Sequence, residues 1–156
     1  MNIEFIGFEL LDDPEREQVV DTIKEVLTGS DLDEMSINIC LVDDETMQDL
    51  HLRFKRKDSL TDVLSFPSPE FEKQFEHSKD LLGDVVICLS VAKHQADSFG
   101  HILAEELAVL SAHGLFHLLG YDHEESEDEA NIQMQGEMYL LDKAGLDPAL
   151  CLIGRA

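Results

Sequence analysis

Residues 102–120 read ILAEELAVLSAHGLFHLLG. Wound as a helix, this stretch places apolar side chains on nearly every turn, which predicts a helix buried in the middle of the core. Gly120 stands at its end, where a left-handed residue commonly closes a helix. The other elements must therefore pack around one central helix.

Most elements before this helix are predicted to be strands, and those after it to be helical. Apolar alternation and short apolar runs predict strands at residues 2–10, 36–42, 62–67 and 84–90. Helices are predicted over 14–29, from a cap at Asp43 or Asp44, over 90–100 and over 130–145. Strands gathered early and helices late favour an α+β domain. At 156 residues the chain has the length of one such domain, so residues 1–156 are predicted to form a single unit.

The composition gives no sign of a membrane or secreted protein. No apolar run approaches about 18 residues, so no membrane-crossing helix is expected. The first residues carry Glu4 and no basic segment, which is unlike a signal peptide. The three cysteines, Cys40, Cys88 and Cys151, are odd in number and form no C-x-x-C pair. Free thiols in a reducing cytoplasm are the expectation.

The charge balance is strongly acidic, with 11 basic and 34 acidic residues and a net charge of -23. Taken alone, this argues against a nucleic-acid partner, because phosphate binding needs a positive field. An acidic coat that maintains solubility is the alternative explanation. One segment differs, because Arg53, Lys55, Arg56 and Lys57 lie within five positions. These four are the candidate residues for binding an anionic substrate.

Three histidines at and beyond the end of the central helix form a candidate metal site. His113 and His117 are four residues apart and project from one helix face. Gly120 permits a turn that can bring His123 back to the same ion. Three protein ligands leave a coordination position open, as in catalytic zinc sites. Zinc is favoured, although nickel, iron or copper could use the same imidazoles.

The spacing H-x-x-x-H-x-x-G-x-x-H matches the zinc signature of the metzincin proteases, which has Glu after the first His. Gly114 occupies that position here and cannot act as a base. Peptide hydrolysis by the zincin route is therefore disfavoured. Glycine inside a helix costs about 1 kcal/mol relative to alanine. Our hypothesis at this level is that a side chain at Gly114 would crowd the metal or the substrate.

Three motifs together resemble a known family. HGLFHLLGYDH, residues 113–123, is similar to the H-G-x-x-H-L-x-G-Y-D-H signature of YbeY-type proteins, bacterial metal-dependent endoribonucleases of rRNA maturation. LHLRFKRKDSLTDVLSFP, residues 50–67, resembles that family's basic segment and T-[DN]-V-L-S-F-P motif. LLGDVVICLSVA, residues 81–92, resembles its G-D-[IV]-x-I strand. The three occur in the family's order.

The resemblance implies a zincin-like site on the central helix and the following loop, with zinc held by His113, His117 and His123. It also implies a single α+β domain in which a small mixed sheet packs with about five helices. The implied activity is endonucleolytic cleavage of RNA in 16S rRNA maturation and ribosome quality control. The implied partners are ribosomal RNA, in its single-stranded segments, and the small subunit with its proteins or assembly GTPases.

One departure from the family affects the catalytic assignment. The family usually has Arg at the position of Lys55 and a small residue at the position of Arg56. Lysine can neutralise a phosphate but lacks the planar fork of arginine. Either Lys55 keeps the role or Arg56 replaces it, and we favour Lys55. A cation from this segment could stabilise negative charge that develops on the phosphate.

Asp122 precedes the third predicted ligand and has two equal interpretations. It is a candidate base or support for the metal site, and it could equally cap the turn through backbone amides. Two rival functions also remain at this level. One is a metallohydrolase of another substrate class, and the other is a non-catalytic ribosome-assembly factor whose metal braces the fold.

Overall fold

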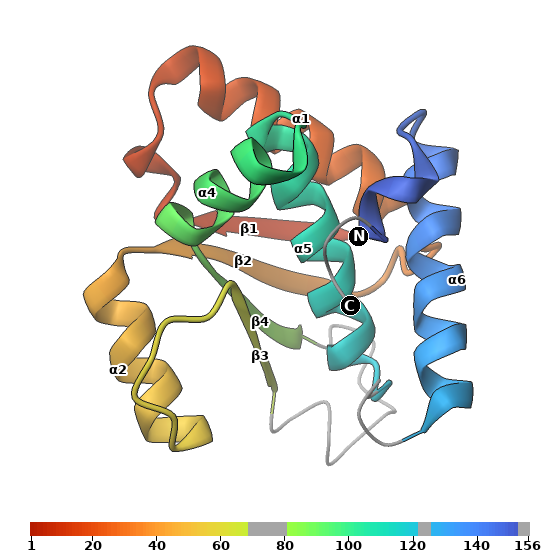
Figure 1. Cartoon of the computed structure of the whole chain (residues 1–156). Helices are drawn as coiled ribbons and strands as arrows, with labels where there is room; N and C mark the ends of the chain where they lie inside the picture. Colours follow the sequence, from red (N-terminus) through yellow and green to blue (C-terminus); the bar gives the residue numbers. More distant parts are fainter. Residues whose placement is uncertain (69–80, 122–125, 153–156) are drawn as a thin grey trace.

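The computed structural model describes residues 1–68, 81–121 and 126–152. Within them lies one four-stranded sheet in the order β1–β2–β4–β3 (Figure 1). The strands are β1 (Asn2–Ile6), β2 (Ser36–Val42), β3 (Val63–Pro67) and β4 (Leu81–Cys88). Strands β1, β2 and β4 run parallel, whereas β3 pairs antiparallel with β4. The sheet is therefore mixed, and the expectation of a small α+β domain is confirmed.

Five α-helices pack with this sheet in the described ranges, which is the expected number. They are α1 (Asp13–Thr28), α2 (Asp44–Lys55), α4 (Leu89–Phe99), α5 (Leu103–Leu118) and α6 (Glu127–Lys143). Short 3-10 turns, Phe8–Leu10 and Pro148–Cys151, follow β1 and α6. None of the helices in the described residues has the length and apolar character needed to cross a bilayer.

Local sequence explains where several helices begin. The side chains of Asp12, Asp43 and Ser126 each accept a hydrogen bond from a first-turn backbone N–H, at 2.9–3.0 Å. Such caps satisfy amides that have no partner inside the helix and contribute about 1 kcal/mol each. The cap at Asp43 fixes the start of α2. That helix then continues to Lys55, so the basic run begins on its last turn.

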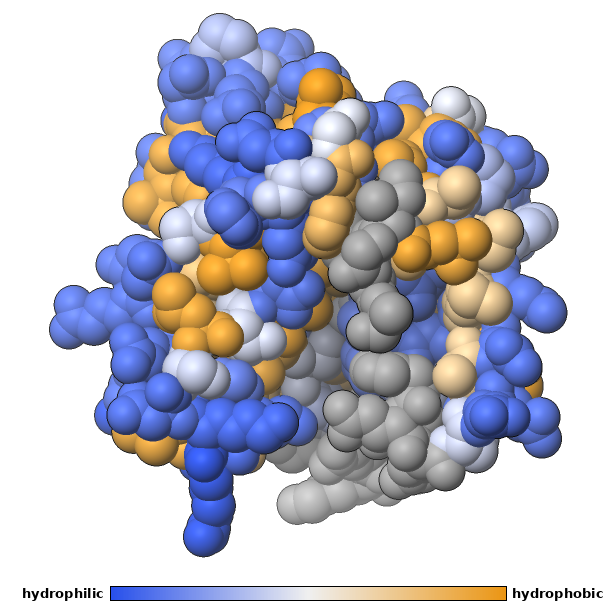
Figure 2. Space-filling view, in the orientation of Figure 1, coloured by the Kyte–Doolittle hydropathy of each residue, from blue (hydrophilic) through white to orange (hydrophobic). Residues whose placement is uncertain are grey.

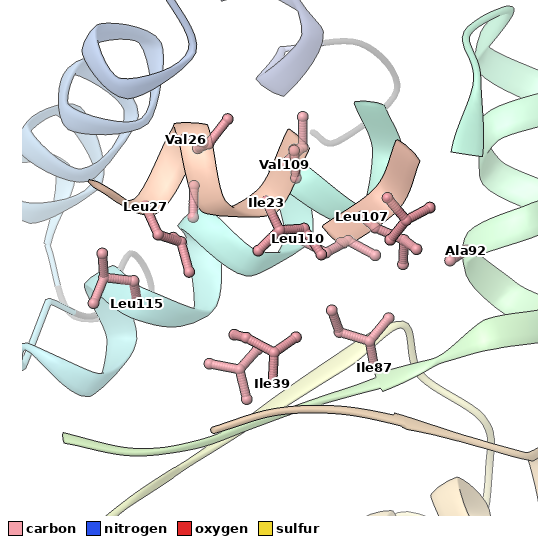
Figure 3. Packing of buried hydrophobic residues seen from close by; sticks show 14 of the residues in the cluster. Ile23, Val26, Leu27, Ile39, Ile87, Ala92, Leu107, Val109, Leu110 and Leu115 are labelled. Carbon is pink, nitrogen blue, oxygen red and sulfur yellow. The ribbon is translucent and has the colours of Figure 1, made fainter. Parts of the chain in front are cut away.

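The larger core lies on one face of the sheet, around α5. Twelve of the sixteen residues of α5 are buried, which confirms the prediction of a central helix. Figure 3 shows Ile23 and Leu27 of α1 beside Leu110 and Leu115 of α5, with Ile39 and Ile87 of the sheet beneath. Burying each large side chain contributes about 1.5–3 kcal/mol. The core thus holds α5 against the sheet and thereby fixes the position of His113 and His117 relative to β4.

The opposite face of the sheet carries a smaller core covered by α2. Met47 of α2 packs there with Leu64, Val86 and Cys88. Neighbouring residues Val85 and Ile87 belong to the larger core, because successive strand residues point to opposite faces. Cys40, half-buried on the α2 side, has its pKa raised to about 11 by burial and by the negative charge of Asp84. All three cysteines are free thiols, as expected.

Candidate metal centre and cleft

His113 and His117 converge on the last two turns of α5. Their Nε2 atoms are 3.0 Å apart, and the two rings meet edge to face. Two imidazole nitrogens bound to one tetrahedral zinc at 2.0–2.1 Å would lie roughly 3.3 Å apart. Side chains four residues apart on a helix are neighbours, and here their nitrogens come together. The pair therefore fits two ligands of one transition-metal ion.

The other ring nitrogen of His113 is held by α6. Nδ1 donates to the carboxylate Oε2 of Glu137 across 3.1 Å, and the Glu137 side chain is 7 % exposed. A proton on Nδ1 leaves Nε2 with its lone pair directed toward His117. Metal-binding histidines commonly donate their second N–H to a carboxylate, which fixes the tautomer and the ring orientation. Glu137 therefore makes His113 ready to bind a metal.

Gln133 also supports this histidine from α6. Its Nε2 donates to the backbone oxygen of His113 at 3.4 Å. Our reading of the sequence missed both Gln133 and Glu137. The sequence did hold a signal, the spacing of four residues that the structure buries on α6: Gln133, Glu137, Leu140 and Leu141. This i, i+4, i+7, i+8 spacing is that of a core-facing stripe, and two polar residues on it mark an internal contact.

A glycine on α6 lets the two helices approach. A Cβ at Gly136 would lie 2.4 Å from Cζ of Phe116 on α5. A larger residue at this position would force the Phe116 ring to shift. Glu137 follows Gly136 directly in the chain. Gly136 thus lets Phe116 lie close to α6, next to the bond from His113 to Glu137.

The structure gives Gly114 a reason different from the one we predicted. A Cβ at Gly114 would lie 2.5 Å from Cγ1 and 2.8 Å from Cγ2 of Val85, and 3.2 Å from Oγ of Ser65. Ser65 also donates to the backbone oxygen of Gly114, at 3.1 Å. Contact with Val85 and Ser65 of the sheet explains the glycine, and crowding at the metal or the substrate stays a prediction. Gly114 allows α5 to pack closely on β3 and β4.

The turn predicted at Gly120 is present. Gly120 has φ +100°, and the amides of Gly120 and Tyr121 donate to the carbonyl oxygens of His117 and Phe116, at 3.0 and 3.1 Å. These two bonds form a Schellman motif, which ends α5 and turns the chain. His123 and Asp122 come next and lie outside the described residues. Within the described ranges, no group of three His, Cys, Asp or Glu side chains could hold a metal ion. Metal binding by His113, His117 and His123 therefore stays a prediction.

A cleft of about 920 Å³ adjoins the histidine pair. One wall comes from α5 and α6 and includes His113, His117, Gln133 and Glu137. The other comes from the end of α2 and the chain leading into β3, and includes His51, Lys55, Lys57, Thr61 and Asp62. The fold thus places two cations across a cleft from the two imidazoles.

The four basic candidates divide into two pairs. Lys55 and Lys57 line the cleft, whereas Arg53 and Arg56 are not among its lining residues. Arg53 forms an ion pair with Asp49 one turn earlier on α2, at 3.2 Å. Arg56 ends α2 in the left-handed conformation, with φ +57°. Of the two candidates for the catalytic cation, Lys55 is the one that faces the cleft.

A buried polar network lies behind the part of the cleft that Gln95 and Asp62 line. Glu106 of α5 is fully buried and accepts from Gln95 at 2.7 Å, and its other oxygen lies 2.6 Å from Nε2 of His101. Gln95 also reaches Asp62 at 3.4 Å, and both Gln95 and Asp62 line the cleft. Buried polar groups need such partners. The network joins α4 and α5 to the start of β3.

Comparison with known proteins assigns the family. The model of the family described as Endoribonuclease YbeY matches residues 9–144. The chain belongs to this family. A YbeY relative from Rhodococcus jostii is 42% identical over 123 residues, which are 75% of this chain and 68% of that protein. One from Persephonella marina is 41% identical over 123 residues, 78% of this chain and 79% of that protein.

A solved structure shares the fold of this YbeY family member. The solution structure of TM1509 from Thermotoga maritima matches with a TM-score of 0.57 and 24% sequence identity. The match covers 92% of this chain and 89% of that one. The family model and the curated relatives confirm the YbeY resemblance drawn from the three sequence motifs, and the solved structure shares the fold.

Proposed function

We propose that this protein is a zinc-dependent endoribonuclease that acts in 16S rRNA maturation and ribosome quality control. The observation that carries the proposal is the convergence of the His113 and His117 Nε2 atoms, 3.0 Å apart, on a cleft that Lys55 also lines. The relatives from Rhodococcus jostii and Persephonella marina are both named endoribonuclease YbeY. The cleft and the family name support the same class of reaction.

In this proposal zinc is held by His113, His117 and His123, and nickel, iron or copper could replace it. Glu137 accepts a hydrogen bond from Nδ1 of His113, which would leave the lone pair of Nε2 for the metal ion. When bound, zinc supplies Lewis-acid polarisation of a phosphoryl oxygen. Asp122 keeps its two roles, as a base near the reacting phosphate or as a cap of the turn.

The chain's own cations face the substrate's charge. Lys55 and Lys57 lie on the wall opposite the histidines and would neutralise the phosphodiester, with Arg53 and Arg56 placed to meet phosphates outside the cleft. The absence of an acidic residue at Gly114 agrees with phosphodiester rather than peptide hydrolysis. Single-stranded segments are the proposed RNA substrates.

The net charge of -23 bears on the partners. A protein so acidic binds bare RNA weakly at physiological salt. We therefore propose that the small ribosomal subunit, through its proteins or an assembly GTPase, presents the RNA. The three free thiols support our proposal that the protein acts in a reducing cytoplasm.

The deciding experiment compares the wild type with His117→Ala on precursor 16S rRNA, both free and within small subunits. Zinc content and folding are recorded for both proteins. We expect cleavage by the zinc-loaded wild type alone. Equal cleavage by both proteins would refute the proposal, because the activity would then be a contaminant.

A second result would favour the rival assembly-factor function. If neither protein cuts RNA although the wild type holds zinc, the metal braces the fold. In that case zinc removal would unfold the domain. If the wild type does cut RNA, analysis of the cleaved ends separates two routes, since a 2′,3′-cyclic phosphate shows attack by the ribose hydroxyl.

A further inference from the structure

The chain between α2 and β3, residues 56–62, carries Lys57 to the cleft but buries almost nothing of its own. Every residue from Leu52 to Ser59 is exposed, as is Leu60, and the neighbouring buried residue on α2 is His51, which is 8% exposed. An exposed loop without packed side chains is free to change its path. Its position must therefore come from hydrogen bonds.

His51 supplies two of these bonds, from its ring and from its backbone. Its Nδ1 donates to the backbone oxygen of Ser59 at 2.8 Å. Its own backbone oxygen accepts from the amide of Lys57 at 3.3 Å. The ring and the backbone of one residue thus hold two points of the loop on either side of Asp58.

A third bond is more exposed. Gln48, one turn earlier on α2, donates to Asp58 at 3.0 Å, and both side chains lie at the surface. Water competes with an exposed bond of this kind, whereas the bond from the buried His51 ring is partly shielded from it. The bond from His51 to Ser59 is therefore the stronger of the two side-chain contacts from α2 to residues 57–59.

We propose that His51 is a positioning residue that holds the α2–β3 loop so that Lys57 reaches the cleft. The inference rests on the proposed function, because it assigns to Lys57 a contact with an RNA phosphate. His51 acts through the loop, and its Nε2 makes no required contact with the substrate.

Two substitutions separate the ring nitrogens. In His51→Asn the amide Nδ2 lies near the former Nδ1 and can still donate to Ser59, but nothing replaces Nε2. In His51→Gln the amide lies near the former Nε2, and the bond to Ser59 is lost. The positioning role predicts that His51→Asn behaves like the wild type and that His51→Gln behaves like His51→Ala.

The first measurement is binding of a short single-stranded RNA across a series of salt concentrations, by fluorescence anisotropy. We expect His51→Ala and Lys57→Ala to weaken binding equally, by about three- to fivefold, and to reduce the salt slope by about 0.7, the value for one lost phosphate contact on a single strand. The double variant should be no weaker than either single one, because both remove the same contact. Gln48→Ala should lose less than twofold.

The second measurement is amide hydrogen exchange of the full chain without RNA. Exchange at Lys57 and its neighbours should accelerate in His51→Ala and remain as in the wild type in His51→Asn. This arm does not depend on RNA. If the wild type neither binds nor cuts RNA, the proposed function fails while exchange still decides whether His51 holds the loop.

Three results would overturn the inference. One is independent, multiplicative losses for His51→Ala and Lys57→Ala. Another is unchanged exchange in His51→Ala. The last is RNA binding by His51→Asn as weak as that of His51→Ala, with His51→Gln unaffected, which would show that Nε2 contacts the substrate directly.

Discussion

Replacing Gly114 by alanine measures how closely α5 approaches the sheet. The new methyl group would lie 2.5 and 2.8 Å from the two methyl carbons of Val85 and 3.2 Å from Oγ of Ser65. Carbon atoms in contact prefer about 3.5–4.0 Å. Val85 is fully buried and β-branched, so it cannot turn both methyl groups away. The helix must move instead.

The expected loss of stability follows from two opposing terms. Forcing a methyl group into a packed core costs about 1–3 kcal/mol, and two simultaneous overlaps place this site near the upper end. Alanine recovers about 1 kcal/mol over glycine within a helix. The net loss is then about 2 kcal/mol, which lowers the melting temperature of a chain of 156 residues by about 4–8 °C.

Urea unfolding of Gly114→Ala, followed by circular dichroism, gives the midpoint and the slope. Gly29→Ala is the matched control, because Gly29 has φ -63° and its added Cβ would meet other atoms only at 3.4 Å. We expect this control to change stability by less than about 0.5 kcal/mol. Adding Val85→Ala to Gly114→Ala should cost less than the same change in the wild type, since it removes the overlap.

An unchanged or raised midpoint for Gly114→Ala, at an unchanged slope, would refute this reasoning. Loss of zinc without loss of stability would also contradict it. That pattern would favour the view that a side chain at Gly114 crowds the metal.

Further predictions concern the metal, the substrate and the thiol. Glu137→Gln should weaken zinc binding by about 10- to 100-fold in a chelator competition, whereas Glu127→Gln, exposed in the first turn of α6, should leave it unchanged. Lys55→Ala should weaken RNA binding and lower its salt slope by about 0.7. Arg53→Ala should lower the slope less than Lys55→Ala does, because the Arg53 side chain pairs with Asp49 and does not line the cleft. The pKa of Cys40 is 9.0 when the thiol is exposed and about 11 in the fold, so its contribution to stability is intact below pH 9.0 and is lost as the pH rises toward 11. The wild type should therefore lose more stability than Cys40→Ala between these pH values, and equal losses would contradict the shift.

The sequence by itself determined the elements that depend on local order along the chain. Apolar spacing predicted α5 as the central helix, because burial of a helix requires apolar residues on most of its turns. The interval of four placed His113 and His117 on one face, since a helix repeats every 3.6 residues. Gly120 predicted the turn after them, and the three motifs identified the family.

Only the tertiary structure decided which distant groups complete the site. Glu137 bonds to His113, and Gly136 lets Phe116 lie close to α6, a fit between two helices that no local pattern encodes. Lys55 lines the cleft and Arg56 does not, since α2 ends there and Arg56 turns left-handed.

The same holds for Gly114, whose neighbour Val85 lies on another element of the chain. A sequence records which residues are small or charged. The sequence does not show which residues of other elements each of these side chains will contact, because those contacts depend on how the helices pack against one another and against the sheet. For this protein, spacing along one helix was enough to predict that His113 and His117 point to one place, while their contacts with α6 and the choice between Lys55 and Arg56 came from packing between elements.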